Sequence, residues 1–329
     1  MSAAPDGPAG PAADRARPVA PVSCVISSFN KRADLLANLR ALAEQTRAPA
    51  EVIVVDNASV DGTAAAVLAE FAPGGSALDV RLVEMPHPRF GACATFNVGF
   101  RLATQEFIAI LDDDVVLPPS WIERLLDRLQ REPPTTALVT TQVIEPRMPD
   151  EYLARPDVSS ERYLCTFRGC GSLARRAALE RAGFYDERFF IYGNERDLAT
   201  RLLDLGFRVL LCPSVVTFHG TPFGLKAGPR SLYYHVRNFW LYAFKHCAWS
   251  DVLRTAWSLA RKALRGAASD RAADAADATG TIGLHESVRS TPGGTWIALK
   301  ATLNALLNLP YCLRRRKVCT APDFRLPVV

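Results

Sequence analysis

The first 120 residues alternate between short apolar segments and amphipathic segments, and each apolar segment ends in polar residues. The apolar segments occupy residues 21–30, 50–59, 81–86 and 106–119. This alternation predicts a mostly parallel sheet with right-handed helical crossovers. Ligands of such sheets collect at the carboxyl ends of the strands. We therefore expect the polar residues at 27–30, 56–59 and 112–114 to lie together at one edge of the sheet.

The rest of the chain predicts further strands and helices and then becomes helical and basic. We expect a strand at 135–144, an irregular stretch from 145 to about 162, a helix at 191–206, a strand at 207–220 and helices at 231–246, 251–265 and 296–317. The expected organisation is a disordered tail at 1–20, an α/β domain at 21–230 and a helical region at 231–329. A flexible linker near 266–294 is indicated by its Ala-, Gly- and Asp-rich composition.

Charge is spread unevenly along the chain. The formal net charge is +5, yet residues 1–219 carry a net charge of −5 and residues 220–329 a net charge of +10. This asymmetry predicts that the last third meets an anionic partner such as a diphosphate or an acidic membrane surface. No helix-turn-helix, zinc-finger or RNP pattern accompanies the basic region, so we expect no nucleic-acid partner.

Hydropathy and cysteine spacing indicate the compartment. No apolar run reaches the roughly 18 residues of a spanning helix, and the N-terminus lacks the apolar segment of a signal peptide. We therefore expect a cytoplasmic protein. The eight cysteines are scattered without a CxxC pair, and several lie in apolar runs. Buried reduced thiols are expected rather than disulfides or a zinc site on cysteine.

The segment ILDDDVV places three carboxylates at the end of a predicted buried strand. Such carboxylates repel one another unless a cation or ligand compensates them. Asp112 and Asp114 are two residues apart, and their hard oxygen atoms suit Mg²⁺ or Mn²⁺. A solvated acidic turn is the alternative. A metal at this position would imply a substrate that carries phosphate.

A series of motifs in a fixed order carries a family resemblance. The series is VSCVISSFNKRADLL, EVIVVDNASVDGT, FNVGF, FIAILDDDVVLPPSWIERL, GCGSLARRAALERAGFYDERFF, NERDLATRL and VVTFHG, from about Val22 to Phe244. It resembles the family 2 glycosyltransferases of the GT-A fold, in particular rhamnosyltransferases and galactofuranosyltransferases. The resemblance implies a Rossmann-like α/β sheet flanked by helices, and an inverting sugar transfer from a nucleotide diphosphate donor with a divalent metal.

The resemblance also implies a nucleotide site. Its proposed members are Ser27, Ser28, Phe29, Asn30, Asp56, Asn97, Asp112, Asp113 and Arg237. The loop from Ser27 to Asn30 is similar to a Pro-Thr-Tyr-Asn turn that frames the nucleoside. Asp56 matches an aspartate that accepts a hydrogen bond from uracil or thymine, although a turn carboxylate is the alternative. Arg237 is expected to close over the diphosphate, although a surface arginine is equally compatible.

Metal and base residues follow from the same resemblance. Asp112 and Asp114 match the family's DxD motif, and His219 resembles a histidine that supplies a third metal ligand. Glu195 falls where the family usually places its catalytic base, and Asp197 is the second candidate. The alternative interpretation is that these two acidic residues only stabilise the N-terminus of a helix through its dipole.

The predicted activity is transfer of a sugar from a UDP- or dTDP-sugar to a hydroxyl of a glycan, a lipid-linked or a small-molecule acceptor, with Mg²⁺ or Mn²⁺. One alternative is a nucleotidyltransferase of sugar phosphates, although no Gly-rich basic loop follows the first strand. Another is a catalytically inactive module of the same fold that binds a glycan or a lipid.

The last predicted helix has an amphipathic pattern. It carries apolar residues at 296, 299, 303, 306, 307 and 313 beside four cations at 314–317. This arrangement fits peripheral contact with an anionic bilayer. Packing of the same stripe on the catalytic domain, or on a second subunit in a homodimer, fits equally well.

Overall fold

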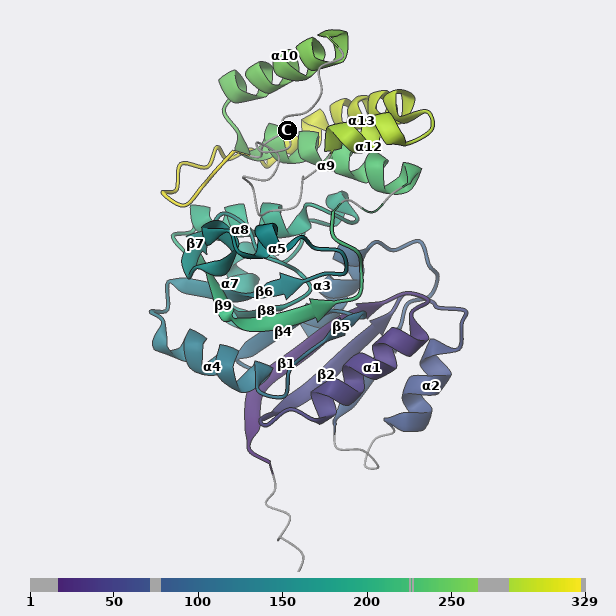
Figure 1. Cartoon of the computed structure of the whole chain (residues 1–329), viewed down its shortest axis with the longest axis vertical. Helices are drawn as coiled ribbons and strands as arrows, with labels where there is room; N and C mark the ends of the chain where they lie inside the picture. The colour runs from purple at the N-terminus through teal and green to yellow at the C-terminus, as the bar shows by residue number, and fades with distance from the viewer. Residues whose placement is uncertain (1–16, 72–77, 225, 227, 266–283, 327–329) are drawn as a thin grey trace, which may run out of the picture.

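The computed structural model describes residues 17–71, 78–224, 226, 228–265 and 284–326 (Figure 1). Most of the predicted N-terminal tail, residues 1–16, lies outside the described residues, and strand β1 already begins at Val19. Residues 266–283 of the predicted linker also lie outside them. The remainder of that linker prediction is wrong, because residues 284–290 form helix α12 and Leu284 is buried.

Four parallel strands build one half of the sheet. They are β1 (Val19–Ser28), β2 (Ala48–Asp56), β3 (Val80–Glu84) and β4 (Phe107–Asp112), in the order β3-β2-β1-β4. β1 pairs in parallel with both β2 and β4. These strands confirm the four predicted from the apolar segments of the first 120 residues.

The second half of the sheet continues the order as β8-β6-β9-β5, with β7 also paired to β9. Its strands are β5 (Val115–Val116), β6 (Thr136–Ile144), β7 (Arg162–Leu164), β8 (Ser172–Arg175) and β9 (Arg208–His219). β8 runs antiparallel to both β4 and β6, so β6 points the same way as β4, and β9 pairs in parallel with β6. The carboxyl ends of β1, β4, β6 and β9 therefore share one edge.

Helices cover both faces of the sheet (Figure 1). One face carries α1 (Arg32–Ala43), α2 (Thr63–Glu70) and α4 (Trp121–Arg131), and the other carries α3 (Ala92–Leu102), α7 (Arg176–Ala182), α8 (Asn194–Asp204) and α9 (Pro229–His246). Helix α3 approaches the sheet closely, because a Cβ atom at Gly99 would lie 2.3 Å from Cγ1 of Val25. Gly99 thus allows close packing of α3 on the sheet.

Short helices interrupt the stretch that the sequence predicted to be irregular. They are α5 (Asp150–Leu153) and α6 (Pro156–Ser159), and a 3₁₀ turn, η1, spans Glu187–Phe189 further along the chain. All eight cysteines are buried, as the sequence predicted.

The described C-terminal helices share the hydrophobic core of the sheet. α9 contributes Phe239, Trp240 and Leu241 to the cluster that contains Val25 and Ile110 of the sheet. α10 (Trp249–Arg265), α12 (Leu284–Ser290), α13 (Gly294–Leu307) and α14 (Leu309–Arg314) lie beyond α9 at the same end of the molecule (Figure 1). Among the described helices, none is long and apolar enough to cross a bilayer.

The single last helix predicted from residues 296–317 is divided in two. α13 ends at Leu307, and α14 begins at Leu309 with a proline in its first turn. Pro310 has no N–H to donate to the preceding turn, so the hydrogen-bond ladder cannot pass through it. Ala301, Ala305 and Cys312 are buried, so both helices also pack inward.

Candidate functional site

A pocket of about 750 Å³ opens at the carboxyl edge of the sheet. The predicted site residues that line it are Ser27, Ser28, Phe29, Asp112, Asp113, Asp114, Glu195 and His219. Asn30, Asp56, Asn97, Asp197 and Arg237 are absent from its lining. The pocket therefore unites residues from the ends of β1, β4 and β9 with the first turn of α8.

The turn after β4 is fixed by hydrogen bonds. Oδ2 of Asp113 accepts from Oγ of Ser28 at 2.9 Å and from the backbone N–H of Phe29 at 3.3 Å. Nδ2 of Asn38 donates to the backbone oxygen of Asp112 at 2.8 Å. These bonds tie the end of β1 to the end of β4 and hold the acidic turn in one conformation.

His219 joins the acidic turn because β9 pairs with β5. Val115 lies opposite His219 in that pairing, so the imidazole reaches Asp114. Nε2 of His219 is 3.1 Å from Oδ1 of Asp114 and 3.6 Å from Oδ2 of Asp112, and Nδ1 is 3.0 Å from Oε1 of Glu145. The structure thus brings together the three predicted metal ligands and adds Glu145.

Protonation of this cluster is strongly perturbed. Burial raises the pKa of Asp112 to about 7 and, together with the charge of Asp114, that of Asp113 to about 6. Burial also acts on Asp114, but hydrogen bonds from His219 and Thr221 outweigh it and lower its pKa to about 2. Burial lowers the pKa of His219, yet hydrogen bonds to Asp114 and Glu145 raise it to about 10. The corner therefore favours positive charge.

The donor set fits a divalent cation. Carboxylate oxygens and an imidazole nitrogen converge, and Glu145 holds the remote ring nitrogen of His219, as carboxylates commonly do for metal-bound histidines. One donor atom each from Asp112, Cys170 and His219 lies within 4.8 Å of the other two. No sequence motif indicated such a role for Cys170 or Glu145. The sequence does contain a signal for Glu145, because this carboxylate directly follows the predicted strand at 135–144 and so lies at the carboxyl end of a strand.

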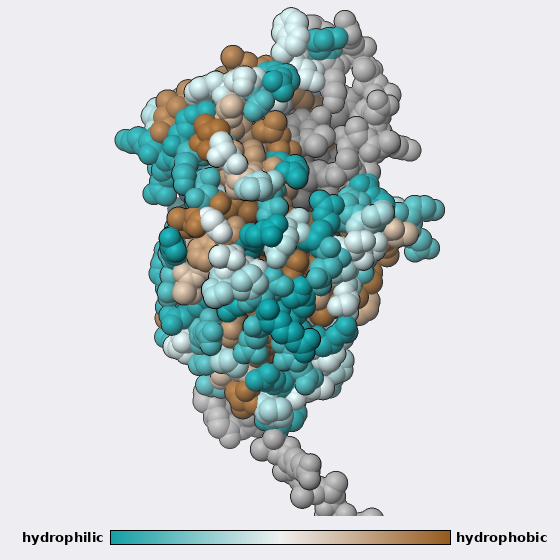
Figure 2. Space-filling view, turned by 90° about the vertical axis from the view of Figure 1, so that its left-hand side faces the viewer, coloured by the Kyte–Doolittle hydropathy of each residue, from teal (hydrophilic) through white to brown (hydrophobic). Residues whose placement is uncertain are grey.

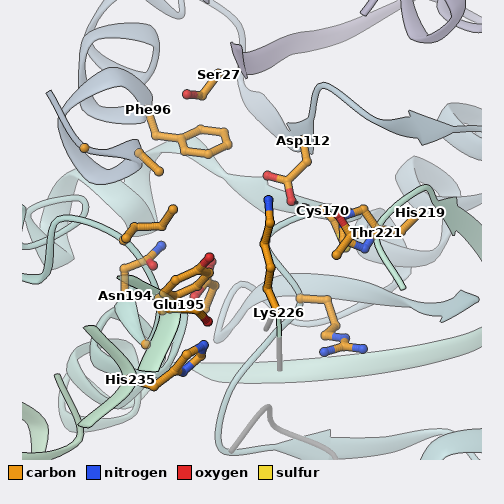
Figure 3. A pocket seen from close by; sticks show the side chains of 18 of the residues that line it. Ser27, Phe96, Asp112, Cys170, Asn194, Glu195, His219, Thr221, Lys226 and His235 are labelled. Carbon is orange, nitrogen blue, oxygen red and sulfur yellow. Dashed lines mark ion pairs between the residues drawn. The ribbon is translucent and has the colours of Figure 1, made fainter. Parts of the chain in front are cut away.

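Glu195 enters the pocket from the first turn of α8. Gly169 allows its close approach, since a Cβ atom there would lie 2.6 Å from Oε1 of Glu195. Burial raises the pKa of Glu195. Figure 3 shows Glu195 and Asp112 facing the same cavity from different sides, with the side chain of Lys226 extending between them.

Asp197 lies in a different environment. It is fully buried, Oδ1 contacts Nζ of Lys245 and Nε2 of His246, and Oδ2 accepts from Nε of Arg201 at 2.9 Å. Burial alone would raise the pKa of Asp197, but Lys245 and Arg201 hold it well below its usual range. Residues two apart on a helix point to nearly opposite sides. Of the two predicted base candidates, only Glu195 therefore faces the pocket.

Asp56 and Asn97 lie beneath the pocket surface. The carboxylate of Asp56 accepts from the backbone N–H and the hydroxyl of Ser59, which is the turn role left open by the sequence. Nδ2 of Asn97 donates to the backbone oxygen of Tyr185 and to Glu187, both at 2.9 Å. These contacts join neighbouring segments, and neither side chain is free to line the cavity.

Asn30 shapes the loop after β1 from outside the pocket. It has a φ of 52°, and its Oδ1 accepts from the backbone N–H of Val60 at 2.8 Å. Its backbone N–H donates to Oγ of Ser59 at 2.8 Å. Asn30 thus links the ends of β1 and β2.

Arg237 points away from the pocket, so its predicted contact with the diphosphate has no geometric basis here. Nε donates to Oδ1 of Asn304 at 2.7 Å, and Nη1 donates to the backbone oxygen of Arg188 at 2.8 Å. The next residue on α9, Asn238, does line the pocket. The position of Arg237 on α9 directs its side chain toward α13. The sequence alone did not indicate that α13 lies on this side of α9.

Asn238 holds a strained loop that leads into α8. Phe190 and Tyr192 both have a φ of 67°, which is unfavourable for side chains with a Cβ atom. Nδ2 of Asn238 donates to the backbone oxygens of Phe189, Ile191 and Tyr192 at 2.8, 2.7 and 2.9 Å. This clamp fixes the entry to the helix that carries Glu195.

Comparison with known proteins gives one family and several relatives. The family described as Glycosyl transferase family 2 matches residues 23–189. The chain is 30% identical over 229 residues to O-antigen biosynthesis protein RfbC of Myxococcus xanthus, covering 60% of this chain and 17% of that protein. It is 31% identical over 132 residues to hyaluronan synthase of Pasteurella multocida, covering 38% and 13%. It is 27% identical over 229 residues to pre-mycofactocin glycosyltransferase of Mycobacterium tuberculosis, covering 65% and 44%. The matched segments thus span less than half the length of these relatives.

Solved structures show the same fold. The mannosyltransferase PcManGT from Pyrobaculum calidifontis, in complex with GDP-Man and Mn²⁺, has a TM-score of 0.54 at 21% identity, over 89% of this chain and 72% of that one. GalNAc-T7 with UDP, GalNAc and Mn²⁺ has a TM-score of 0.52 at 16% identity, over 68% and 50%. The predicted α/β GT-A fold is confirmed.

Proposed function

Because the chain belongs to family 2 of the glycosyl transferases, we propose that it transfers a sugar from a nucleoside diphosphate sugar to an acceptor hydroxyl with inversion at the anomeric carbon. The observation that carries this proposal is the arrangement of the pocket. Glu195 and the Asp112–Asp114 turn face one cavity of about 750 Å³, which is large enough for a donor and part of an acceptor.

Inverting transfer requires a base opposite the leaving group. The acceptor oxygen forms a bond to the anomeric carbon while the bond from that carbon to the diphosphate oxygen breaks, and the diphosphate takes the electron pair. Glu195 accepts the hydroxyl proton. Its raised pKa suits this role, because a carboxylate with a higher proton affinity is a stronger base.

We propose that Asp112, Asp114 and His219 hold Mg²⁺ or Mn²⁺. When bound, the ion supplies Lewis-acid stabilisation of the negative charge that develops on the diphosphate. Ser28 and Asp113 keep the adjoining backbone turn in place. Lys226, rather than Arg237, is the proposed cation beside the diphosphate, supported by its position in the cavity (Figure 3).

The proposed donors are UDP- or dTDP-sugars, as the sequence resemblance implies. Proteins of related fold have been solved in complex with GDP-Man, with UDP-GlcNAc and with UDP. The nucleobase that this chain recognises therefore needs a direct test. Thermal unfolding with Mn²⁺ should show stabilisation by UDP or dTDP that exceeds stabilisation by GDP. An Asp114→Asn variant, which keeps the side-chain shape, should lose the Mn²⁺-dependent part. No response to any nucleotide would refute the donor proposal.

Chemistry is tested separately by hydrolysis of the donor sugar. In the absence of acceptor, the full chain should release sugar from the responsive donor slowly and in a metal-dependent manner, with the opposite anomer as the first product by NMR. A chain that binds UDP but never cleaves the donor, with or without added acceptors, would be a binding module instead.

The acceptor is proposed to be a hydroxyl group of a glycan, of a lipid-linked molecule or of a small molecule.

A membrane surface is the proposed partner of the C-terminal helices. The exposed fraction is 46% or more for each of five apolar residues of α13, namely Trp296, Leu299, Leu303, Leu306 and Leu307. Exposed apolar side chains and neighbouring cations favour an anionic bilayer. Figure 2, which views the molecule from the left-hand side of Figure 1, shows apolar side chains among hydrophilic ones at the end where the C-terminal helices lie.

Sedimentation with anionic and neutral vesicles tests the membrane proposal. Removing the whole C-terminal segment is unsuitable, because Ala301 and Cys312 are part of the core. Trp296→Ser combined with Leu303→Ser should abolish binding to anionic vesicles, whereas Leu68→Ser, a control at an equally exposed leucine on α2, should leave it intact. Equal binding by all variants would refute the proposal, and dimerisation lost only in the double variant would identify a second subunit as the partner.

A further inference from the structure

We infer that Cys170 is a ligand of the divalent ion, so that this centre prefers an ion with affinity for sulfur, such as Co²⁺ or Zn²⁺, over Mg²⁺. The inference rests on the metal site of the proposed function and deepens it, because it adds a residue and a class of ion. Among the described residues, Asp112, Cys170 and His219 form the one group of three such side chains whose donor atoms all lie within 4.8 Å of one another.

The donor atoms lie near enough to converge on one ion. With metal–ligand bonds of about 2.0–2.3 Å in a tetrahedral site, two donors on one ion lie roughly 3.3–3.8 Å apart. A movement of up to about 1.5 Å therefore closes the group from its outer limit of 4.8 Å. Asp112 keeps 40% of its side-chain surface exposed toward the pocket, so its carboxylate has room to make that movement.

The backbone around Cys170 is held tightly. A Cβ atom at Gly171 would lie 2.4 Å from Oγ1 of Thr217, and one at Gly169 would lie 2.6 Å from Oε1 of Glu195. Cys170 is thus held between β9 and α8 by two glycines that pack closely against these elements. Its side chain is 94% buried yet lines the pocket. This position delivers Sγ to the corner occupied by Asp112 and His219.

An outer carboxylate orients His219 for metal binding. Its Nδ1 is 3.0 Å from Oε1 of Glu145, and Nη2 of Arg168 is 3.5 Å from Oε2 of the same carboxylate. Such an outer carboxylate fixes the tautomer of a metal-binding histidine and directs the other nitrogen to the ion. Nε2 points toward Asp112 and Asp114.

The mixed donor set determines the preferred ion. Mg²⁺ strongly favours oxygen ligands, whereas thiolate and imidazole select d-block ions. On binding, the thiol of Cys170 loses its proton to solvent as the metal–sulfur bond forms, without any change of oxidation state. The other seven cysteines are also buried, but none belongs to a group of this kind among the residues that the structure describes.

Titration of the full chain with Co²⁺ alone tests the inference. The wild type should develop the near-ultraviolet absorption of a sulfur-to-cobalt charge transfer, and calorimetry should give a much weaker affinity for Mg²⁺. Cys170→Ser should lose the band and weaken Co²⁺ binding by at least about tenfold, the scale already reached by outer-shell changes. The matched control is Cys212→Ser, a buried cysteine on β9 outside the group, which should retain both.

The possible failures can be told apart. Co²⁺ binding without the band, or a band that survives in Cys170→Ser while that variant unfolds at the wild-type temperature, overturns the assignment of Cys170 and leaves the proposed transfer intact. Absence of Co²⁺ binding, also with UDP present, overturns both this inference and the metal role. Donor hydrolysis that proceeds regardless of metal would then still support sugar transfer.

Discussion

Replacing Gly169 with alanine tests whether the position of the Glu195 carboxylate governs the proposed transfer. The added Cβ atom would lie 2.6 Å from Oε1 of Glu195, and an ordinary contact begins at 3.4 Å, so the carboxylate must retreat by about 0.8 Å. A misplacement of about 1 Å at a reacting group can cost roughly 100-fold in rate. We therefore expect kcat to fall by about 10- to 100-fold in steady-state transfer or donor hydrolysis.

A double-mutant cycle provides the control. The clash is with the end of a flexible side chain, and the φ of Gly169 is outside the left-handed region, so the unfolding temperature should change little. In a Glu195→Gln background, the same alanine should cost almost nothing further, because the two residues act through one group. An unchanged kcat in Gly169→Ala, or an equal loss in both backgrounds, would refute the reasoning.

Three further changes probe the same region. Glu195→Gln should lower kcat by about 10²- to 10⁴-fold with unchanged nucleotide affinity by calorimetry. Burial raises the pKa of Glu195 above the ordinary value of 4.5, so the carboxylate becomes protonated, and loses its function as a base, at a pH above 4.5. The acid limb of the kcat–pH profile should therefore lie above pH 4.5, and a limb below pH 4.5 would contradict the assignment of Glu195 as the base. Asp197→Asn removes one of the two carboxylates that contact Nζ of the buried Lys245 and leaves Asp186 at 2.7 Å, so it should lower the free energy of unfolding by about 1.5–3 kcal/mol in urea titrations, and unchanged stability would contradict this. Asn238→Ala removes the donor to three carbonyls, so it should reduce kcat and lower stability by about 1–3 kcal/mol, and wild-type values of both would show that the loop does not need the clamp.

The sequence was informative where chemistry and backbone period coincide. Buried strands ending in polar residues predicted β1 to β4, and the rule that ligands gather at carboxyl ends predicted that Ser28, Asp113 and Asp114 lie together, as they do in the pocket. His219 followed from a family resemblance, and its contact with Asp114 depends on the pairing of β5 with β9. Register across a sheet joins residues that are about a hundred positions apart, which local patterns do not encode.

Helix rotation explains two of the five predicted site residues that lie outside the pocket lining. Asp197 and Arg237 have the right chemistry for the roles that the resemblance implied, but each lies on the face of its helix that packs inward, where it meets Lys245 or Asn304. Asp56 and Asn97 likewise use their polar atoms to join segments of the protein. A one-residue difference along a helix turns a side chain by about 100°, so neighbouring residues on α8 or α9 face quite different surroundings.

The sequence alone was sufficient to predict the alternation of strands and helices and the acidic residues at a strand end. Hydrophobic periodicity and the repulsion between adjacent carboxylates are local properties of the chain. Only the tertiary structure decided which carboxylate faces the cavity and that Cys170 lies beside Asp112 and His219. Those facts depend on the order of β4, β8, β6 and β9 in the sheet and on the rotation of α8. Both are set by packing between distant segments, which no local pattern of residues records.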